Sequence, residues 1–282
     1  MSQSVIRIDG ERKSVRSLKA FQESISEPAK HEVLIKVHSV SLNYRDIVIA
    51  TSKYPYPVKD RVIPCSDAAG IVVRFHGQGG PIDGVLREYV NIPATSAVKI
   101  RKDSPQNFSE WSTVVCTGVT AWNALYGQPA SETGSDCLIP RFGADHGVNY
   151  KTHPEWSKEV LRLTNGEGVD YVLENDGSGT IAESLNCVKM GGNVSVIGFL
   201  SQAKQSEMPD VAGLALSKGA VVRGVIVGST QLLEEVVQFV ARKELRLPVE
   251  REFKFTQEDV VNAYEYASSG THIGKVCIKL VE

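Results

Sequence analysis

Two glycines between an apolar run and a predicted helix form the pattern in this sequence that most suggests anion chemistry. They lie in the segment 174–180, Glu-Asn-Asp-Gly-Ser-Gly-Thr, with Gly177 at its centre. Backbone N–H groups in the first turn of a helix attract phosphate and other anions. The third glycine of a dinucleotide fingerprint is absent. An ordinary strand-to-helix turn is therefore the alternative interpretation.

The cysteines and histidines do not form a metal-binding pattern. The chain has no Cys-x-x-Cys pair, and its six histidines include no His-x-x-x-His pair. Zinc sites commonly use such closely spaced ligands. We therefore predict no zinc and no other dedicated metal site, and we expect the five cysteines to be free, buried thiols: Cys65, Cys116, Cys137, Cys187 and Cys277.

The composition favours a protein whose partner is a small molecule. The formal net charge of the 282-residue chain is -2, and its basic residues are dispersed, which argues against nucleic acid as a partner. No apolar run reaches the length of a signal peptide or a membrane span, so we predict a cytoplasmic protein without membrane contact. The length favours two domains.

The hydrophobic pattern changes along the chain. The segment 32–42 alternates apolar and polar residues, as half-buried antiparallel strands do, and 70–74 and 84–92 are further candidate strands. From Gly118 onward, helix-length segments are separated by apolar runs at 169–174, 193–198 and 221–227. Such runs are typical of parallel strands that are covered on both faces.

Helix signals separate and follow these runs. We predict helices at 154–164, at 180–190 with a stop at Gly191-Gly192, and at 256–269 with Thr256 as the cap. An alternating strand is predicted at 274–280. The fold class is therefore α/β, with a β-barrel-like part followed by a parallel sheet.

Four segments together resemble the medium-chain dehydrogenase/reductase superfamily: 41–46, 63–70, 118–125 and 143–150. The resemblance is to its zinc-independent quinone and enoyl reductase branch, because no cysteine stands at 43–46. It implies a GroES-like β-barrel catalytic domain (1–117, with 248–282 returning to it). A truncated Rossmann-like, doubly wound parallel sheet (118–247) would bind the cofactor.

The resemblance also assigns site residues. It places Asn43 and Tyr44 beside the nicotinamide, with Tyr44 hydrogen-bonded to a substrate carbonyl; packing of Tyr44 between domains is the alternative. Thr117 would approach the nicotinamide or simply cap a helix. The implied cofactor contacts are Thr117, Gly118, Thr120, Gly177, Gly198, Phe199, Leu200, Gly228 and Ser229.

A central part of this fold is missing from the sequence. A βαβ unit needs about 30 residues, yet the segment 137–142 supplies only six between the two family-like flanks. The Gly-rich phosphate loop and the residue that selects NAD or NADP are therefore absent. A second, smaller omission falls within 70–84. The gap should expose apolar strand faces that a partner could cover, and the resemblance makes 221–227 a possible homodimer edge.

The predicted reaction is hydride transfer from NADPH or NADH to an activated C=C or C=O, such as an enone, quinone or aldehyde, without metal. The alternative is a catalytically inactive, truncated or misspliced relative that acts as a binding protein. The surviving motifs favour the reductase, whereas the missing phosphate loop favours the alternative.

Overall fold

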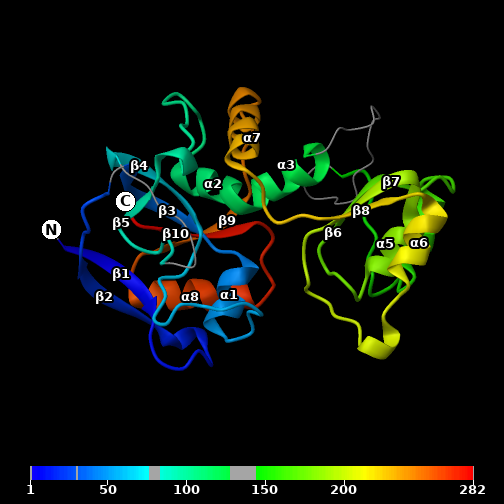
Figure 1. The fold of residues 1–282 in the computed structure, drawn as a ribbon, viewed down its shortest axis with the longest axis horizontal. Helices are drawn as coiled ribbons and strands as arrows, with labels where there is room; N and C mark the ends of the chain where they lie inside the picture. Colours follow the sequence, from blue (N-terminus) through cyan, green and yellow to red (C-terminus); the bar gives the residue numbers. More distant parts are fainter. Residues whose placement is uncertain (1, 30, 76–82, 128–143, 282) are drawn as a thin grey trace. The chain divides into compact units, whose positions relative to one another are not determined.

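The computed structural model describes residues 2–29, 31–75, 83–127 and 144–281. The predicted shortening near 137–142 lies outside these residues. By its internal contacts the chain divides into two compact units, one formed by Met1–Val119 with Ser229–Glu282 and the other by Thr120–Gly228. The elements of each unit are labelled in Figure 1.

The first unit is built on β-strands. The antiparallel pair β1 (Ser2–Ile8) and β2 (Leu18–Ser24) forms one sheet. The larger sheet has the order β4 (Asp67–Phe75), β3 (Glu32–Ser41), β10 (Lys275–Lys279) and β9 (Val249–Lys254), and β5 (Tyr89–Pro93) also pairs with β3. Strand β3 is antiparallel to β4, β5 and β10, whereas β9 and β10 are parallel.

Residues of several strands share one core, and the register of β3 against β4 shifts between Val37 and Ser39. Val37 and Val40 of β3, Ile278 of β10 and Tyr264 are fully buried in a single hydrophobic cluster. Tyr264 comes from α8 (Gln257–Ser268), whose cap is Thr256 as predicted: its hydroxyl accepts from the Asp259 N–H at 3.1 Å. The C-terminal strand and helix thus complete the N-terminal core.

The remaining helices of this unit are short, with one exception. They are α1 (Tyr44–Ala50), α2 (Phe108–Thr113), the π-helical η3 (Val114–Gly118), α7 (Thr230–Arg242) and the single turns η1 (Val15–Ser17) and η2 (Ala94–Ser96). The chain around α7 is held by Gln106, whose side-chain NH2 donates to the carbonyls of Val240 and Leu245. Arg246 also forms a two-pronged ion pair with Glu110.

The second unit contains the predicted parallel sheet, in the order β6 (Val169–Glu174), β7 (Val188–Val196) and β8 (Val221–Gly224). Its helices are α3 (Val119–Tyr126), α4 (Trp156–Leu163), α5 (Ile181–Cys187) and α6 (Val211–Lys218), and η5 (Gln205–Glu207) is a short turn.

Helices cover the two faces of this sheet differently. Val194 lies in a cluster with residues of α5 and α6, so these helices cover its face. The next residue, Ser195, points to the opposite face, because side chains alternate along a strand. There its hydroxyl donates to the carbonyl of Ala124 in α3 at 3.2 Å. The α/β fold class, with a parallel sheet between helices, is therefore confirmed.

One predicted helix boundary is wrong. The helix predicted at 180–190 ends at Cys187, and Val188 already begins β7. Gly191 and Gly192 do not stop a helix but lie inside the strand, where Gly191 has φ +74°. The parallel pairing of Val188 with Val169 of β6 outweighs the local helix signal.

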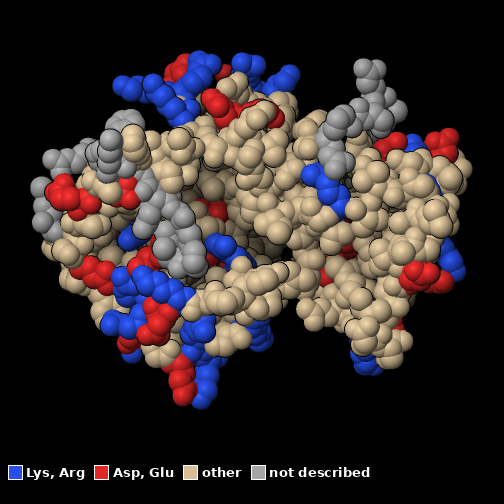
Figure 2. Space-filling model, in the orientation of Figure 1, with Lys and Arg blue, Asp and Glu red and all other residues tan. Residues whose placement is uncertain are grey.

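Two further properties bear on partners. Acidic and basic side chains are interspersed over the visible face of the first unit (Figure 2). Among the described residues, no helix combines the length and apolarity needed to cross a membrane.

Candidate functional site

Asn43 and Tyr44 lie where β3 gives way to helix α1. Asn43 is the N-cap, and its N–H donates to Asp46 Oδ2 at 2.8 Å. Lys275 of β10 holds the Asn43 side chain, because its ammonium donates to Asn43 Oδ1 at 2.6 Å and to the Leu42 carbonyl at 2.8 Å. Tyr44 is 49% exposed. The structure thus brings together a fixed amide and an accessible phenol.

Beneath this turn lie two buried carboxylates, Asp46 and Asp67. Burial, together with the nearby charge of Asp67, raises the pKa of Asp46 to about 6, although the Asn43 N–H, Arg45 and Lys275 oppose the shift. Asp46 Oδ1 and Asn43 Nδ2 have no hydrogen-bond partner in the part of the chain that is described. The ammonium of Lys275 therefore offsets part of the negative charge of these buried carboxylates.

Thr117 and Gly118 lie in η3, and Thr120 follows in α3. Because Thr117 sits inside the π-helical turn, it does not cap a helix. Its side chain is exposed, whereas Thr120 is buried. The turn is tied to the carboxylates of the same unit, since the Cys116 N–H donates to Asp67 Oδ2 at 3.1 Å. π-helical turns of this kind occur frequently at functional sites.

The other predicted cofactor residues of the second unit follow the carboxyl ends of its strands. Glu174, Val196 and Gly224 are in register across β6, β7 and β8, so the loops that follow them begin at one edge of the sheet. Open α/β sheets bind ligands at this edge. The loop after β7 carries Phe199 and Leu200, which are 42% and 52% exposed.

Gly177 and Gly198 allow two of these loops to pack closely. A Cβ atom at Gly198 would overlap the carbonyl oxygen of Asn175, and one at Gly177, where φ is +90°, would lie 3.0 Å from the carbonyl oxygen of Gly198. The structure therefore brings together Gly177, Gly198 and Phe199. The glycines make room for protein backbone at these points.

A carboxylate of the protein itself occupies the Gly-x-Gly turn. Glu174 is buried, and its Oε1 accepts from the N–H groups of Asp176 and Gly177 at 2.8 and 2.9 Å and from Thr180 Oγ1 at 2.7 Å. Its Oε2 accepts from Ser184 Oγ at 2.5 Å. The N–H groups of Asp176 and Gly177 are thus engaged by Glu174 and are not available to a phosphate. Sequence reasoning missed this role, although an acidic residue directly before the turn was its signal.

The loop after β8 holds a strained residue. Val227 has φ +50°, which is unfavourable for a β-branched side chain. Its carbonyl accepts from Asn123 Nδ2 at 2.7 Å. Arg223 in turn donates to Asn123 Oδ1 at 3.0 Å and to its carbonyl at 2.6 Å. This chain of contacts fixes the loop that contains Gly228, and sequence reasoning identified neither Asn123 nor Arg223.

The residues near the turn of α1 do not fit a zinc ion. Positions 43–46 supply an amide, a phenol, a guanidinium and a carboxylate. Cys65 is buried, and its thiol lies 3.2 Å from the Tyr264 hydroxyl. Burial raises the pKa of the Cys116 thiol to about 11, which disfavours the thiolate that binds zinc. Across the described ranges, no three His, Cys, Asp or Glu side chains are grouped to hold a metal.

Family comparisons match both parts of the chain. Residues 29–80 match the alcohol dehydrogenase GroES-like domain, and residues 138–242 match the zinc-binding dehydrogenase family. The expected GroES-like and Rossmann-like architecture is thus confirmed by sequence as well as by fold.

Individual relatives cover nearly the whole chain. A zinc-type alcohol dehydrogenase-like protein of Schizosaccharomyces pombe is 29% identical over 318 aligned positions, which cover 88% of this chain and 91% of that protein. A structure described as an alcohol dehydrogenase from Sinorhizobium meliloti is 26% identical, covers 99% of this chain and 100% of its own, and has a TM-score of 0.84. An NADPH:quinone reductase structure from Bacillus thuringiensis shares the fold, with 18% identity, coverage of 100% of both chains and a TM-score of 0.80.

Together with the geometry, these matches define an NAD(P)-dependent oxidoreductase of the alcohol dehydrogenase and quinone reductase type. The family matches, the relatives and the fold all support the expected place of this chain in the medium-chain dehydrogenase/reductase superfamily. The 318 positions aligned with the Schizosaccharomyces pombe protein exceed the 282 residues of this chain. That relative therefore has residues that this chain lacks.

Proposed function

We propose that this chain reduces an activated C=C or C=O substrate with NADPH or NADH and without zinc. The observation that carries the proposal is the turn of α1, where Tyr44 is accessible and Lys275 fixes the Asn43 amide. A positioned hydrogen-bond donor stabilises the negative charge that develops on a substrate oxygen during reduction. The residues of this turn supply such donors where zinc enzymes would supply a Lewis acid.

The reduced nicotinamide supplies a hydride when it is bound. Tyr44 then has two tasks: its O–H polarises the substrate oxygen by donating a hydrogen bond, and it can release the proton that completes reduction at that oxygen. For an enone, the hydride would go to the β-carbon, the enolate oxygen would accept the hydrogen bond from Tyr44, and a proton from water would complete the reduction at the α-carbon. Lys275 holds the Asn43 oxygen by a hydrogen bond and so orients the amide.

For the cofactor, the described residues favour contacts at the carboxyl edge of the parallel sheet. Phe199 and Leu200 offer exposed apolar surface after β7, and Gly228 follows the fixed loop after β8. Thr117 and Gly118 in η3, with Ser229, are the further proposed contacts. Because Glu174 already binds the amide of Gly177, we assign the Gly177 turn to loop packing beside the cofactor and not to phosphate binding.

The test is oxidation of NADPH and NADH by the purified, mass-verified chain with an enone, a quinone and an aldehyde, in the presence of a metal chelator. We expect turnover with at least one pair. Tyr44→Phe should lower kcat about 100-fold, because it removes a hydrogen-bond donor used in the transition state. Tyr56→Phe is the matched control, since Tyr56 is also exposed in the same unit. Saturable binding without turnover would instead support the inactive binding protein.

A further inference from the structure

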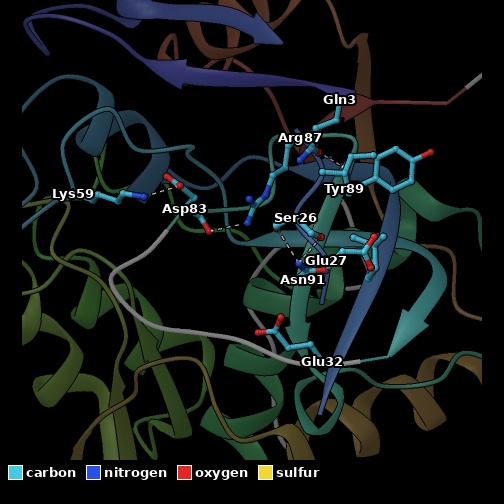
Figure 3. Close-up of a pocket in the computed structure, with 11 residues that line it drawn as sticks. Gln3, Ser26, Glu27, Glu32, Lys59, Asp83, Arg87, Tyr89 and Asn91 are labelled. Atoms are coloured by element: carbon cyan, nitrogen blue, oxygen red, sulfur yellow. Dashed lines mark hydrogen bonds and ion pairs between the residues drawn. The ribbon is translucent and has the colours of Figure 1, made fainter. Parts of the chain in front are cut away.

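A pocket of about 250 Å³ lies in the first unit and is lined by residues from β1, β3, β5 and the segments that flank them. Figure 3 shows its polar lining, which includes Gln3, Glu32, Arg87 and Asn91. None of the predicted substrate or cofactor residues lines it. The pocket is therefore a candidate site with chemistry of its own.

Arg87 is the unusual feature of this pocket. Its Nε is buried and has no hydrogen-bond acceptor within the described part of the chain. Its Nη2 reaches only the main-chain carbonyl of Asp83, at 3.5 Å. Burial lowers the pKa of Arg87 because it disfavours the charged form. The charges of Asp83 and Glu23 oppose this shift, but Arg87 forms no ion pair with either of them among the described residues. A desolvated guanidinium without an ion pair is stabilised by an anion that can enter.

The nearest carboxylate does not fill that role, because Asp83 is already engaged. Its Oδ1 accepts from Arg7 Nη1 and from the Ile63 N–H, both at 3.0 Å. Its Oδ2 accepts from Lys59 at 2.6 Å. Asp83 thus serves two other cations, and Arg87 keeps an unsatisfied capacity to donate.

The part of the pocket lining around Asn91 offers hydrogen-bond acceptors instead of donors. Asn91 donates through Nδ2 to the hydroxyl and carbonyl of Ser26, at 3.1 and 3.2 Å, which fixes the orientation of the amide. Its Oδ1 is consequently an oriented acceptor, and it is buried without a donor among the residues described. Glu27 and Glu32 also line the pocket (Figure 3). This part attracts a cation or an N–H donor.

We propose that the pocket binds a small zwitterion of the amino-acid type. Its carboxylate accepts from Arg87, and its ammonium donates to Asn91 Oδ1 on the side of the pocket that Glu32 lines. Gln3 adds a donor for the carboxylate, because its Oε1 is used by the Tyr89 N–H at 2.9 Å and its NH2 group remains. A dianion such as phosphate fits less well, since Glu32 would repel its second charge.

The experiment measures binding of glycine, L-alanine, L-valine and L-leucine to the full chain by ligand-observed NMR. We expect at least one of them to bind saturably below about 1 mM, a typical metabolite affinity range. For L-alanine, the matched probes propionate and ethylamine each lack one charge and should bind at least tenfold more weakly, about 1.4 kcal/mol. Inorganic phosphate is the competing anion.

Two variants locate the site. Arg87→Met should abolish amino-acid binding, whereas Arg101→Gln, an exposed arginine of the same unit, should leave it unchanged. Asn91→Leu should reduce the preference for L-alanine over propionate toward one, which a nonspecific loss of structure would not do. The proposal is overturned if none of the four amino acids binds, or if phosphate binds more tightly than all of them.

Discussion

Replacing Asp46 by asparagine should make the protein more stable at neutral pH. Asp46 is fully buried, and its pKa rises from 3.8 to about 6 in the folded protein. The folded chain therefore holds a proton on Asp46 over a pH range in which the unfolded chain has lost it. The cost of burying the charge is absent below about pH 4, appears as the pH rises toward 6, and is complete above that value. Asp46→Asn removes this cost and keeps an oxygen that can accept from the Asn43 N–H.

The magnitude follows from the shift. A rise of about two units in the pKa of Asp46 corresponds to a loss of about 3 kcal/mol in unfolding free energy at neutral pH, since one pKa unit is worth about 1.4 kcal/mol. Between about pH 4.5 and pH 8, the unfolding free energy of Asp46→Asn should rise by about 2 kcal/mol relative to the wild type. The difference between the two proteins is the useful quantity, because the other carboxylates titrate equally in both.

Urea unfolding followed by circular dichroism at a series of pH values measures this difference. Asp103→Asn is the control, because the pKa of this exposed carboxylate is lowered by its hydrogen bond with Arg101. Its pH dependence should be small and of opposite sign. If the unfolding free energies of the wild type and Asp46→Asn change in parallel from pH 4.5 to pH 8, the pKa of Asp46 is not raised. The description of Asp46 as a buried, desolvated carboxylate is then wrong.

Two further predictions concern the second unit. Glu174→Ala should lower the unfolding free energy by about 3 kcal/mol, because it leaves the buried Gly177 N–H, the half-buried Asp176 N–H and two hydroxyls without their acceptor. An unchanged urea midpoint would contradict the network. Val227→Gly should raise the unfolding free energy by about 1 kcal/mol, since it relieves the positive φ. Val221→Gly in the extended strand β8 should lower it, and equal effects of the two glycine variants in thermal unfolding would refute the strain argument.

The sequence predicted the strands and the helix cap that are determined by neighbouring residues. The apolar run 169–174 coincides with β6, and the alternation of 32–42 matches β3 (Glu32–Ser41). The cap at Thr256 was recognisable because a threonine preceded a helical pattern with acidic residues in its first turn. These signals lie within a few residues of the structures that they specify.

The missed features depend on contacts between distant segments. No periodicity links Lys275 to Asn43, because β10 reaches the turn of α1 only through its pairing with β3. The end of α5 at Cys187 is set by strand pairing with β6, which overrode the glycines at 191 and 192. The sequence shows an acidic residue at position 174. It does not show that the Glu174 carboxylate accepts hydrogen bonds from the turn before α5, because that depends on how the turn folds back over β6.

The central claim, hydride transfer by this chain without a metal, is tested most directly by following the hydride itself. The mass-verified protein is incubated with NADPH or NADH deuterated at C4, a chelator, and an enone or an aldehyde, and the product is analysed by mass spectrometry and NMR. The account predicts one deuterium on the β-carbon of the enone product or on the carbinol carbon of the alcohol. Absence of deuterium from every product, or its appearance only after zinc is added, would contradict the account.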